Sequence, residues 1–401
     1  MLEQFGCLRK SKIERALSSI MKSKLIYISN TRLPSEKANS YQTVQMCNSF
    51  SKAYDEVELW TGKSRNTKEL ESITDIYGFY NIKNSFLIKK FFQIDSIILF
   101  KINQFIWANL RNLVFSLNVC AHLIKYKNSK NVTLYSRDWC FLFVYLFFRN
   151  IGLVNNKLFY ESHKFYKFLP KSLSKIDGVI VINNYLYSLH EDIGIKRLFL
   201  AHDGVNVDEY ESISRYDFQS KKESFTVVYT GSLFLWKGVN TVVDSLKFLP
   251  AHVDLIFIGG SGQYLLDFKE YVKDSGFGDR IKVISHIPKK ELLKFIEIAD
   301  ALVLPNSAKD KMSLFTSPIK LFEYMASKRP IIASNIASIA EVLTDQKNAL
   351  LFNPDDSEDL AFQISRTMES DFTKMVHQAE KDSLKYTWDK RAKDIDNFMN
   401  E

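Results

Sequence analysis

Short apolar runs rich in valine, isoleucine, leucine and aromatic residues alternate along the chain with amphipathic stretches of helical length. Runs of this kind are typical of buried β-strands, and their alternation with helices predicts parallel sheets covered by helices on both faces. The predicted fold class is therefore α/β. The predicted strands span residues 24–30, 56–62, 131–136, 156–163, 178–184 and 196–205, and then 225–232, 253–260, 280–287, 300–307, 328–335 and 348–354.

The length of the chain favours two domains, because 401 residues exceed what one hydrophobic core usually supports. A polar, turn-rich linker at residues 202–224 separates the two series of predicted strands. We therefore expect an N-terminal doubly wound domain over residues 21–205 and a C-terminal one over residues 206–379. Residues 1–20 are expected to form an extension ahead of the first domain.

Ligands of doubly wound sheets bind at the carboxyl ends of the strands, where "GSLFLWKG" follows one predicted strand. Gly231 permits a sharp turn, and Lys237 begins the next helix, which suits phosphate binding. A surface lysine ahead of a helix is the alternative. Gly259 and Gly260 would let a ligand approach the next strand end, although a plain turn also explains them.

A second phosphate site is predicted in "SPIKLFEYMA", which follows another predicted strand. Ser317 and Pro318 are expected to begin a helix, since proline is favoured at the first helical position. The free N–H groups from Ile319 onward and the Lys320 ammonium would hold a diphosphate. Glu323, one turn further, would accept hydrogen bonds from a ribose. A capped structural helix with a solvated glutamate is the alternative.

The order and spacing of several motifs give a specific resemblance. They are "VVYTGSLFLWKGVNTVVDSL", "LIFIGGSG", "SPIKLFEYMASKRPIIASNIASIAEVL" and "ALLFNPDDSEDLA". Together they resemble the donor domain of the retaining GT-B glycosyltransferases of family 4, also called glycosyl transferases group 1, over nearly all of residues 222–370. Upstream, "IYISNTRLPSEKANSYQTVQMCNSF", "YSRDW", "LFYESHKF" and "LFLAHDGVNVDEYE" resemble the family more weakly.

The resemblance implies the GT-B fold, in which two Rossmann-like doubly wound domains face each other across a cleft. "YTWDKRAKDI" is similar to the family's C-terminal helix, so the helix within residues 380–401 is expected to cross back onto the N-terminal domain.

The resemblance also implies roles for individual residues. Lys237 and Lys320 would contact the donor diphosphate, and Glu323 the donor ribose. His163, in "YESHKF", matches an active-site histidine near the transferred sugar, and a buried structural histidine is the alternative. The implied donor-binding residues are Gly231, Ser232, Gly259, Gly260, Ser317, Pro318, Ile319 and Glu323. The implied acceptor-side loop contains Ser35, Glu36, Lys37 and Asn39.

Three departures from the family pattern stand out. The glycines usual in the acceptor-side loop are replaced by "SEKANS". Ser232 occupies the place of a common arginine, and Phe315 that of the first glutamate in a paired-glutamate motif. One cationic contact and one sugar-orienting carboxylate are therefore missing.

The implied reaction transfers a sugar from a nucleotide-diphosphate sugar to an acceptor hydroxyl of a glycan or lipid, with retention of configuration, in polysaccharide, lipopolysaccharide or glycolipid synthesis. No cofactor or metal ion is expected, and "PDDSED" indicates a helix start. One alternative is a non-catalytic GT-B subunit that binds a nucleotide sugar or stabilises a partner enzyme. Another is an isomerase of nucleotide sugars, which would turn over without an acceptor.

Charge and apolar pattern bear on location. The formal net charge of +8 favours an anionic partner, but no nucleic-acid-binding module is recognisable. Residues 84–127 mix lysines and arginines with phenylalanine, isoleucine and tryptophan, which predicts helices at an anionic membrane surface. Helices packed on the N-terminal sheet with solvated basic residues are the alternative.

No secretory signal or membrane span is predicted. The longest apolar run, at residues 140–148, is far shorter than the roughly 20 residues that cross a bilayer. The 4 cysteines lack metal-ligand spacing and are expected to be reduced thiols. We therefore expect a cytoplasmic protein, with peripheral association at the inner face of the cytoplasmic membrane as an extension of that hypothesis.

Overall fold

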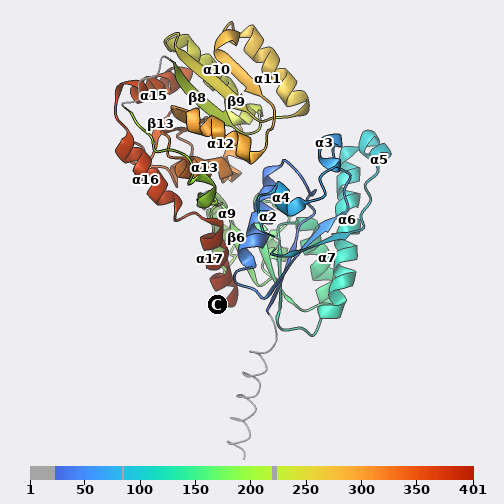
Figure 1. Ribbon diagram of the computed structural model, residues 1–401. Coiled ribbons are helices and arrows are strands. Elements are labelled where there is room, and N and C mark those ends of the chain that lie inside the picture. Colours follow the sequence, from blue (N-terminus) through green and yellow to red (C-terminus); the bar gives the residue numbers. More distant parts are fainter. Residues whose placement is uncertain (1–22, 84, 219–223) are drawn as a thin grey trace, which may run out of the picture.

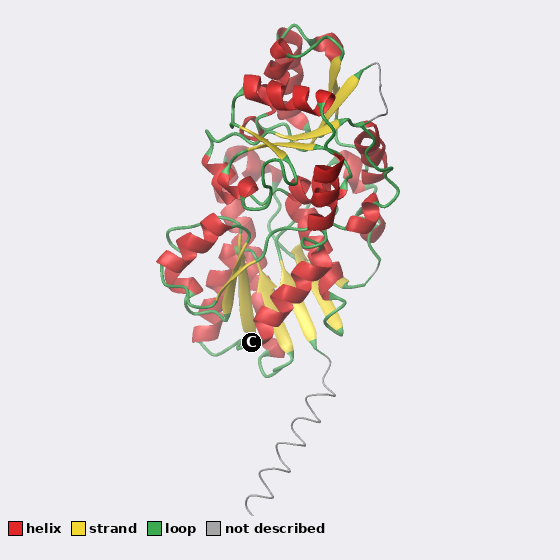
Figure 2. Ribbon diagram, turned by 90° about the vertical axis from the view of Figure 1, so that its left-hand side faces the viewer, coloured by secondary structure: helices red, strands yellow, loops and turns green. Residues whose placement is uncertain are grey.

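The structure, a computed structural model, describes residues 23–83, 85–218 and 224–401, which fold into two α/β domains (Figure 1). The predicted extension at residues 1–20 and residues 219–223 of the predicted linker lie outside the described residues. Each domain contains one parallel sheet flanked by helices (Figure 2). The predicted fold class, two doubly wound α/β domains, is confirmed.

The first domain contains a 7-stranded sheet in the order β3-β2-β1-β4-β5-β6-β7. Its strands are β1 Lys24–Ile28, β2 Glu56–Gly62, β3 Leu87–Phe91, β4 Val132–Ser136, β5 Lys157–Ser162, β6 Gly178–Val181 and β7 Leu198–Leu200. Its helices are α2 Ala38–Phe50, α3 Lys68–Glu71, α4 Ile76–Phe79, α5 Ile97–Ile102, α6 Gln104–Leu123, α7 Trp139–Asn150, α8 Pro170–Leu173 and α9 Asn184–Asp192.

The second domain contains a 6-stranded sheet in the order β10-β9-β8-β11-β12-β13. Its strands are β8 Phe225–Thr230, β9 Val253–Ile258, β10 Ile281–Ile284, β11 Ala301–Leu304, β12 Ile331–Ser334 and β13 Leu350–Phe352. The helices that follow are α10 Val239–Asp244, α11 Gly262–Asp274, α12 Lys289–Ile298, α13 Ile319–Ala326, α14 Ala337–Ala340, α15 Ser357–Glu369, α16 Thr373–Ser383 and α17 Trp388–Asn400.

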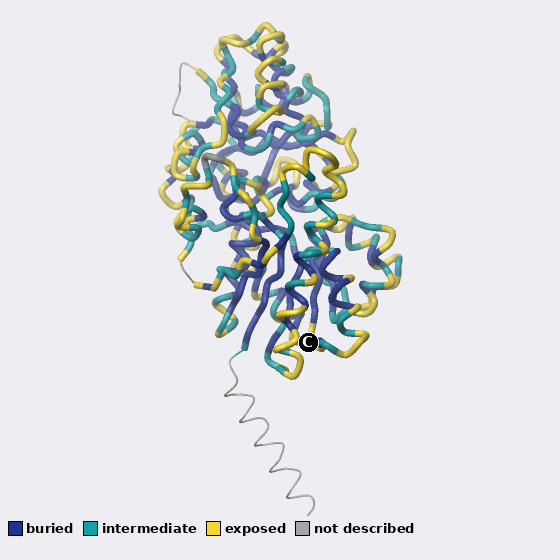
Figure 3. Tube along the Cα trace, turned by 90° about the vertical axis from the view of Figure 1, so that its right-hand side faces the viewer, coloured by how far each residue is buried: buried dark blue, intermediate teal, exposed yellow. Residues whose placement is uncertain are grey.

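Both faces of the central strands of each sheet are buried, which explains their continuous apolar runs in the sequence (Figure 3). On β1, Ile26 and Ile28 join one hydrophobic cluster, while Leu25 and Tyr27 join the cluster on the opposite face. This alternation follows from the two-residue repeat of a strand. The parallel strands therefore need no polar face.

Strand β3 was missed by the sequence analysis, which predicted helices throughout residues 84–127. The strand lies at the edge of the first sheet, and of its residues only Phe91 is buried. Lys89 on this strand forms an ion pair with the buried Glu58 of β2, at 2.8 Å. The prediction of a membrane-surface helix containing Lys89 and Lys90 is therefore wrong, because an edge strand tolerates the basic pattern that we attributed to a helix.

The predicted linker is packed structure over most of its described length. Val205, Tyr210 and Ile213 join the core of the second domain, and the 3₁₀ turn η2 spans Val207–Tyr210. Helix α16 packs against α13 in the second domain, whereas α17 packs against α2 in the first (Figure 1). The C-terminal segment thus connects the two domains a second time.

Candidate active site

Helix α13 begins one residue later than the sequence predicted. Pro318 occupies its N-cap position with an extended backbone (φ −73°, ψ 117°), so the expectation of proline at the first helical position is wrong. The hydroxyl oxygen of Ser317 accepts a hydrogen bond from the backbone N–H of Asp203, at 3.0 Å. Since Asp203 follows β7, this contact ties the start of α13 to the first domain.

Glu323 lies one turn into α13 and is buried between two lysines. Its Oε1 atom is 2.5 Å from Lys289 Nζ, and its Oε2 atom is 2.6 Å from Lys320 Nζ. Burial alone would raise the pKa of Glu323, but the two ammonium groups outweigh burial and lower it to about 2. Oε2 is paired with the Lys320 ammonium but forms no hydrogen bond of good geometry with a described residue, so it retains capacity to accept from a ligand.

Lys289, the first residue of α12, is a site residue that the sequence analysis missed. Its ammonium group is 2.6 Å from the hydroxyl of Tyr210 and 3.5 Å from Oε2 of Glu209. Both partners belong to η2, in the stretch predicted as a linker. Lys289 meets these partners and Glu323 only when η2, α12 and α13 pack together, so no short sequence motif contains the site.

Lys237 ends the 3₁₀ turn η3, Leu235–Lys237, at the carboxyl end of β8. Its ammonium group lies over the ring of Trp236, 4.0 Å from the ring centroid, and forms no ion pair within the described part of the chain. Burial lowers the pKa of Lys237 to about 8. The next residue, Gly238, has φ +70°, and a Cβ there would lie 1.8 Å from the carbonyl oxygen of Pro305. A partly buried cation without a counter-ion suits an anionic ligand.

The turns after β8 and β9 pack directly on each other. A Cβ at Gly259 would lie 2.1 Å from the carbonyl oxygen of Gly231, and Gly259 has φ +130°. Close packing of two backbone segments therefore accounts for Gly259 without any ligand. A Cβ at Gly260 would likewise meet the side chain of Leu233, at 2.8 Å. Ser232 accepts a hydrogen bond from the Tyr229 hydroxyl through its carbonyl oxygen, at 2.7 Å.

Asn306 follows β11 and is fully buried, yet neither end of its amide has a hydrogen-bond partner among the described residues. The next residue, Ser307, donates its backbone N–H to the carbonyl oxygen of Trp236, at 3.0 Å. This contact places Asn306 beside the turn that carries Lys237. The sequence analysis missed Asn306 because an asparagine after a strand reads as a turn residue.

His163 follows β5, and its Nε2 atom is 2.5 Å from Oε1 of Glu161. Glu161 is completely buried; it also accepts a hydrogen bond from Gln42 at 2.7 Å and forms an ion pair with Arg391 at 3.1 Å. Burial lowers the pKa of His163 to about 4, with Arg137 acting in the same direction and Glu161 opposing it. The imidazole is therefore neutral at physiological pH, and its side chain is 22% exposed.

The predicted acceptor-side loop is partly helical. Ser35 is buried and Glu36 half-buried, whereas Lys37 and Asn39 are exposed. Lys37 is the N-cap of α2, and Asn39 lies in the first turn of that helix, so its assignment to a loop is wrong. The apolar pattern does not mark the start of this helix, because Ala38 and Asn39 in its first turn face solvent.

Phe315, where the resemblance expects a glutamate, packs against the first domain. Its ring centroid is 5.5 Å from that of Tyr185 on α9. The amide of Asn183 donates hydrogen bonds to the carbonyl oxygens of Leu314 and Thr316, at 2.9 and 3.0 Å. An interdomain contact therefore occupies the position of the missing carboxylate.

Hydrogen bonds join the two sides of the site. The amide of Gln42 lies beside His163 and donates to Asp203 at 2.9 Å, and the backbone of Asp203 reaches Ser317. The structure thus links His163 with the start of α13, which carries Lys320 and Glu323. Lys237 and the glycine turns follow β8 and β9 in the second domain, and the Asn306 segment after β11 contacts the turn that carries Lys237.

The described part of the chain shows neither a metal-binding cluster nor a membrane-spanning helix. No group of three or more histidine, cysteine, aspartate and glutamate side chains there is arranged to hold a metal ion. None of the helices described combines the length and the apolar character needed to cross a bilayer.

The match to a family model agrees with this geometry. Residues 212–385, which make up most of the second domain, match the family model described as glycosyl transferases group 1. The matched residues include Lys237, Lys320 and Glu323.

Curated relatives are glycosyltransferases. The chain is 27% identical over 180 residues to an uncharacterized glycosyltransferase, MJ1607, of Methanocaldococcus jannaschii, covering 43% of each chain. It is 29% identical over 150 residues to the O-antigen chain mannosyltransferase RfbU of Salmonella typhimurium, covering 37% of this chain and 40% of that one. These matches span less than half of either relative.

Solved structures show the same fold over almost the whole chain. Anabaena HepE in complex with UDP and glucose superposes with a TM-score of 0.70 at 15% identity, covering 94% of this chain and all of that one. The lipopolysaccharide outer core galactosyltransferase WaaB superposes with a TM-score of 0.68 at 14% identity, covering 94% and 99%. The fold is GT-B, as the resemblance implied.

Proposed function

We propose that the protein is a retaining glycosyltransferase that moves a hexosyl group from a nucleotide-diphosphate sugar to a hydroxyl of a glycan or lipid-linked acceptor. The observation that carries this proposal is Glu323, an ionised and buried carboxylate held between two lysines with one oxygen not fully hydrogen-bonded. Such an oxygen suits a ribose hydroxyl, because charge-assisted hydrogen bonds are the stronger ones.

Lysines supply the positive charge that the reaction needs. As the donor bond breaks, negative charge grows on the leaving diphosphate, and cations placed beforehand stabilise it. Lys237 has no carboxylate partner in the described structure, and Lys320 lies in the first turn of α13 beside free backbone N–H groups. The proposal therefore requires neither a metal ion nor a cofactor.

The buried amide of Asn306 supplies further donor and acceptor groups beside Lys237. Leaving a buried amide unpaired costs about 1–3 kcal/mol, so a ligand that pairs with it recovers that cost on binding. We assign Asn306 to the donor site on this ground. The contacting part of the donor would be a phosphate oxygen or a sugar hydroxyl.

Relatives and neighbours support the substrate class. HepE has been crystallised with UDP-glucose, and RfbU and WaaB are named for O-antigen and lipopolysaccharide core sugars. We accordingly place this protein in the synthesis of a bacterial polysaccharide, lipopolysaccharide or glycolipid. A non-catalytic subunit of the same fold is the second candidate, favoured by the loss of a carboxylate at Phe315.

Incubation of the protein with nucleotide sugars and a lipid or glycan acceptor fraction tests the proposal. Proton NMR of the product should show the anomeric configuration of the donor. A product with inverted configuration would contradict retention, and donor binding without any transfer would favour the non-catalytic subunit.

We also place the protein at the inner face of the cytoplasmic membrane. Helices α5 and α6 lie side by side (Figure 1). Several of their large apolar side chains are exposed to solvent. We call this the α5–α6 surface; its exposed apolar residues are Ile97, Ile98, Phe100, Ile102, Phe105, Ile106, Leu110, Leu113 and Leu117. Scattered single apolar residues are normal on a protein surface, but a contiguous group marks a contact site.

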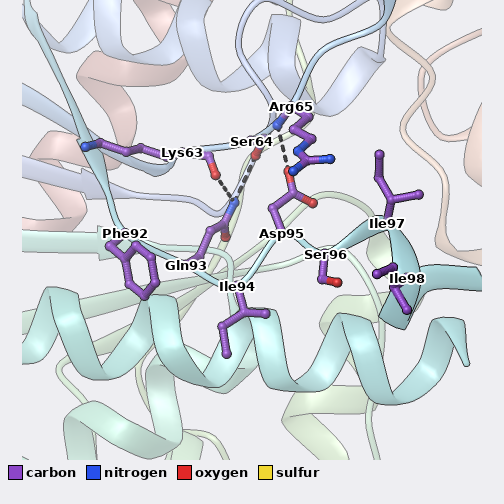
Figure 4. A pocket seen from close by; sticks show the side chains of 10 residues that line it. All are labelled: Lys63, Ser64, Arg65, Phe92, Gln93, Ile94, Asp95, Ser96, Ile97 and Ile98. Carbon is purple, nitrogen blue, oxygen red and sulfur yellow. Dashed lines mark hydrogen bonds between the residues drawn. The ribbon is translucent and has the colours of Figure 1, made fainter. Parts of the chain in front are cut away.

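Basic residues border the α5–α6 surface. A groove of about 680 Å³ next to α5 is lined by Lys63 and Arg65 together with Phe92, Ile97 and Ile98 (Figure 4). Exposed cations beside exposed apolar side chains complement an anionic lipid surface. Lipid-linked acceptors would then be presented on the side of the first domain.

A further inference from the structure

The charged groups behind His163 form a buried network that reaches the last helix of the chain. Arg391 on α17 forms an ion pair with Oε2 of Glu161, and their side chains are 3% and 0% exposed. The same guanidinium donates hydrogen bonds to the carbonyl oxygens of His202 and Ala201, at 2.8 and 3.3 Å. Arg391 is thus held through Nε and Nη2, and Glu161 is held ionised although it is buried.

Glu161 determines which nitrogen of His163 carries the proton. An ionised carboxylate only accepts hydrogen bonds, and its Oε1 atom is 2.5 Å from Nε2 of His163, so Nε2 must be the N–H. The amide of Gln42 directs its two protons to Glu161 and Asp203, at 2.7 and 2.9 Å. In a neutral ring the other nitrogen, Nδ1, is an acceptor, and it meets no hydrogen-bond donor among the described residues.

We propose that Glu161, held in place by Arg391, is a positioning residue that fixes the proton of His163 on Nε2, so that Nδ1 accepts a hydrogen bond from a hydroxyl of the sugar substrate. The substrate part of this inference rests on the proposed function. The assignment of the proton to Nε2 rests on the contacts of Glu161 alone.

Several charged groups surround the ring. Glu161 approaches from β5, Arg137 from the segment after β4, where it binds the amide of Gln42, and Arg391 from α17. Asp203 lies on the far side of Gln42. The two arginines favour the neutral imidazole and Glu161 favours the charged one, so removal of Arg391 should shift the balance towards imidazolium.

Nitrogen-15 NMR of the full chain with labelled histidine tests the inference without substrate. The wild-type protein should show the Nε2–H tautomer of His163 and titrate well below pH 6. Arg391→Gln should raise the titration midpoint by about one pH unit and lower kcat about tenfold with a smaller change in the donor KM. Arg391→Lys should restore the wild-type midpoint in part. Asp389→Asn is the matched control, because it removes an exposed ion pair between α17 and Lys52, which lies just after α2.

An unchanged tautomer and midpoint in folded Arg391→Gln would overturn the inference. If that variant does not fold, the nitrogen-15 spectrum of Glu161→Gln is the test. This substitution keeps the shape of the side chain at position 161, but both tautomers of His163 should then be populated. A wild-type tautomer in Glu161→Gln would equally contradict us. Absence of transferase activity in the wild-type protein would instead contradict the proposed function and leave the NMR result valid.

Discussion

Oε1 of Glu323 lies 2.5 Å from Nζ of Lys289, which stands 34 residues earlier in the chain. The other oxygen of Glu323 faces Lys320. Lys289 is held by Tyr210 as well, whereas Lys320 lies in the first turn of α13, where a diphosphate is expected. We infer that Lys289 keeps the carboxylate in place while Lys320 turns towards the donor.

Replacement of Lys289 tests whether this lysine holds the Glu323 carboxylate in place. Lys289→Met leaves Glu323 with one partner instead of two, so we expect a loss of about 2–3 kcal/mol in the free energy of unfolding. Nucleotide affinity should fall as well, because Glu323 loses its orientation. Urea denaturation and calorimetry measure both. Lys290→Met, at the exposed neighbouring position, should change neither the free energy of unfolding nor the nucleotide affinity. A Lys289→Met protein as stable as wild type would refute the role that we give to Lys289.

Lys237 should matter more for turnover than for binding. Lys237→Ala removes a charge whose interaction strengthens as the diphosphate departs, so we expect kcat to fall about 100-fold with a smaller effect on nucleotide affinity. Lys247→Ala removes an exposed lysine of the same domain and should behave as wild type. Equal turnover in the two variants would place the leaving-group charge elsewhere.

The same lysine predicts a pH dependence. The pKa of Lys237 is lowered to about 8, so kcat/KM should fall as the pH rises through 8 and the ammonium loses its proton. For the free protein the sign is opposite: because the folded pKa lies below the ordinary lysine value of 10.5, stability should increase as the pH rises from 8 towards 10.5. Lys237→Met should remove both effects. A profile that stays flat to pH 9.5 would contradict this account.

Asn306 offers a test in which stability and affinity move in opposite directions. Asn306→Leu removes an unpaired buried amide, so the ligand-free protein should be as stable as wild type or more stable by about 1 kcal/mol, while donor affinity falls. Asn348→Leu is the control: this buried amide accepts from the Thr344 N–H at 2.7 Å, so its loss should destabilise the protein. Weaker stability with unchanged affinity in Asn306→Leu would give Asn306 a purely structural role.

The α5–α6 surface predicts binding to anionic vesicles. The double variant Ile102→Ser, Phe105→Ser should lose co-sedimentation with vesicles that contain phosphatidylglycerol, because both side chains are highly exposed there. Leu266→Ser, at an exposed position of the second domain, should retain binding. Lys101→Ala should weaken binding most at low salt. A wild-type protein that ignores such vesicles at low ionic strength would contradict membrane placement.

Local pattern predicted the fold well, and its failure at β3 has a physical cause. Strands that are buried on both faces have continuous apolar runs, which the sequence shows directly. Strand β3 lies at a sheet edge and lacks such a run, and its Lys89 forms an ion pair with Glu58. The first turn of α2 was assigned to a loop for a related reason, since Ala38 and Asn39 are exposed. The apolar pattern therefore located the strands that are buried on both faces, but it missed β3, this helix turn and the buried turn η2 in the predicted linker.

The site divides in the same way. Lys237, Lys320 and Glu323 stand in local motifs at strand and helix ends, where the sequence could point to them. Lys289 gains its partners only through the packing of η2, α12 and α13. Arg391 reaches Glu161 from the last helix of the chain. Such contacts join distant segments, so no short motif contains them.

Nucleotide-sugar binding by the wild-type protein and Glu323→Ala is the most direct test of the central claim. In a thermal-shift titration with UDP-, GDP-, ADP- and dTDP-sugars, at least one donor should raise the melting temperature of the wild-type protein. Glu323→Ala should bind that donor about 1.5–3 kcal/mol more weakly, because it lacks the charged acceptor for the ribose. If folded Glu323→Ala binds the donor with wild-type affinity, or if no nucleotide sugar stabilises the wild-type protein, the donor site that we propose is wrong.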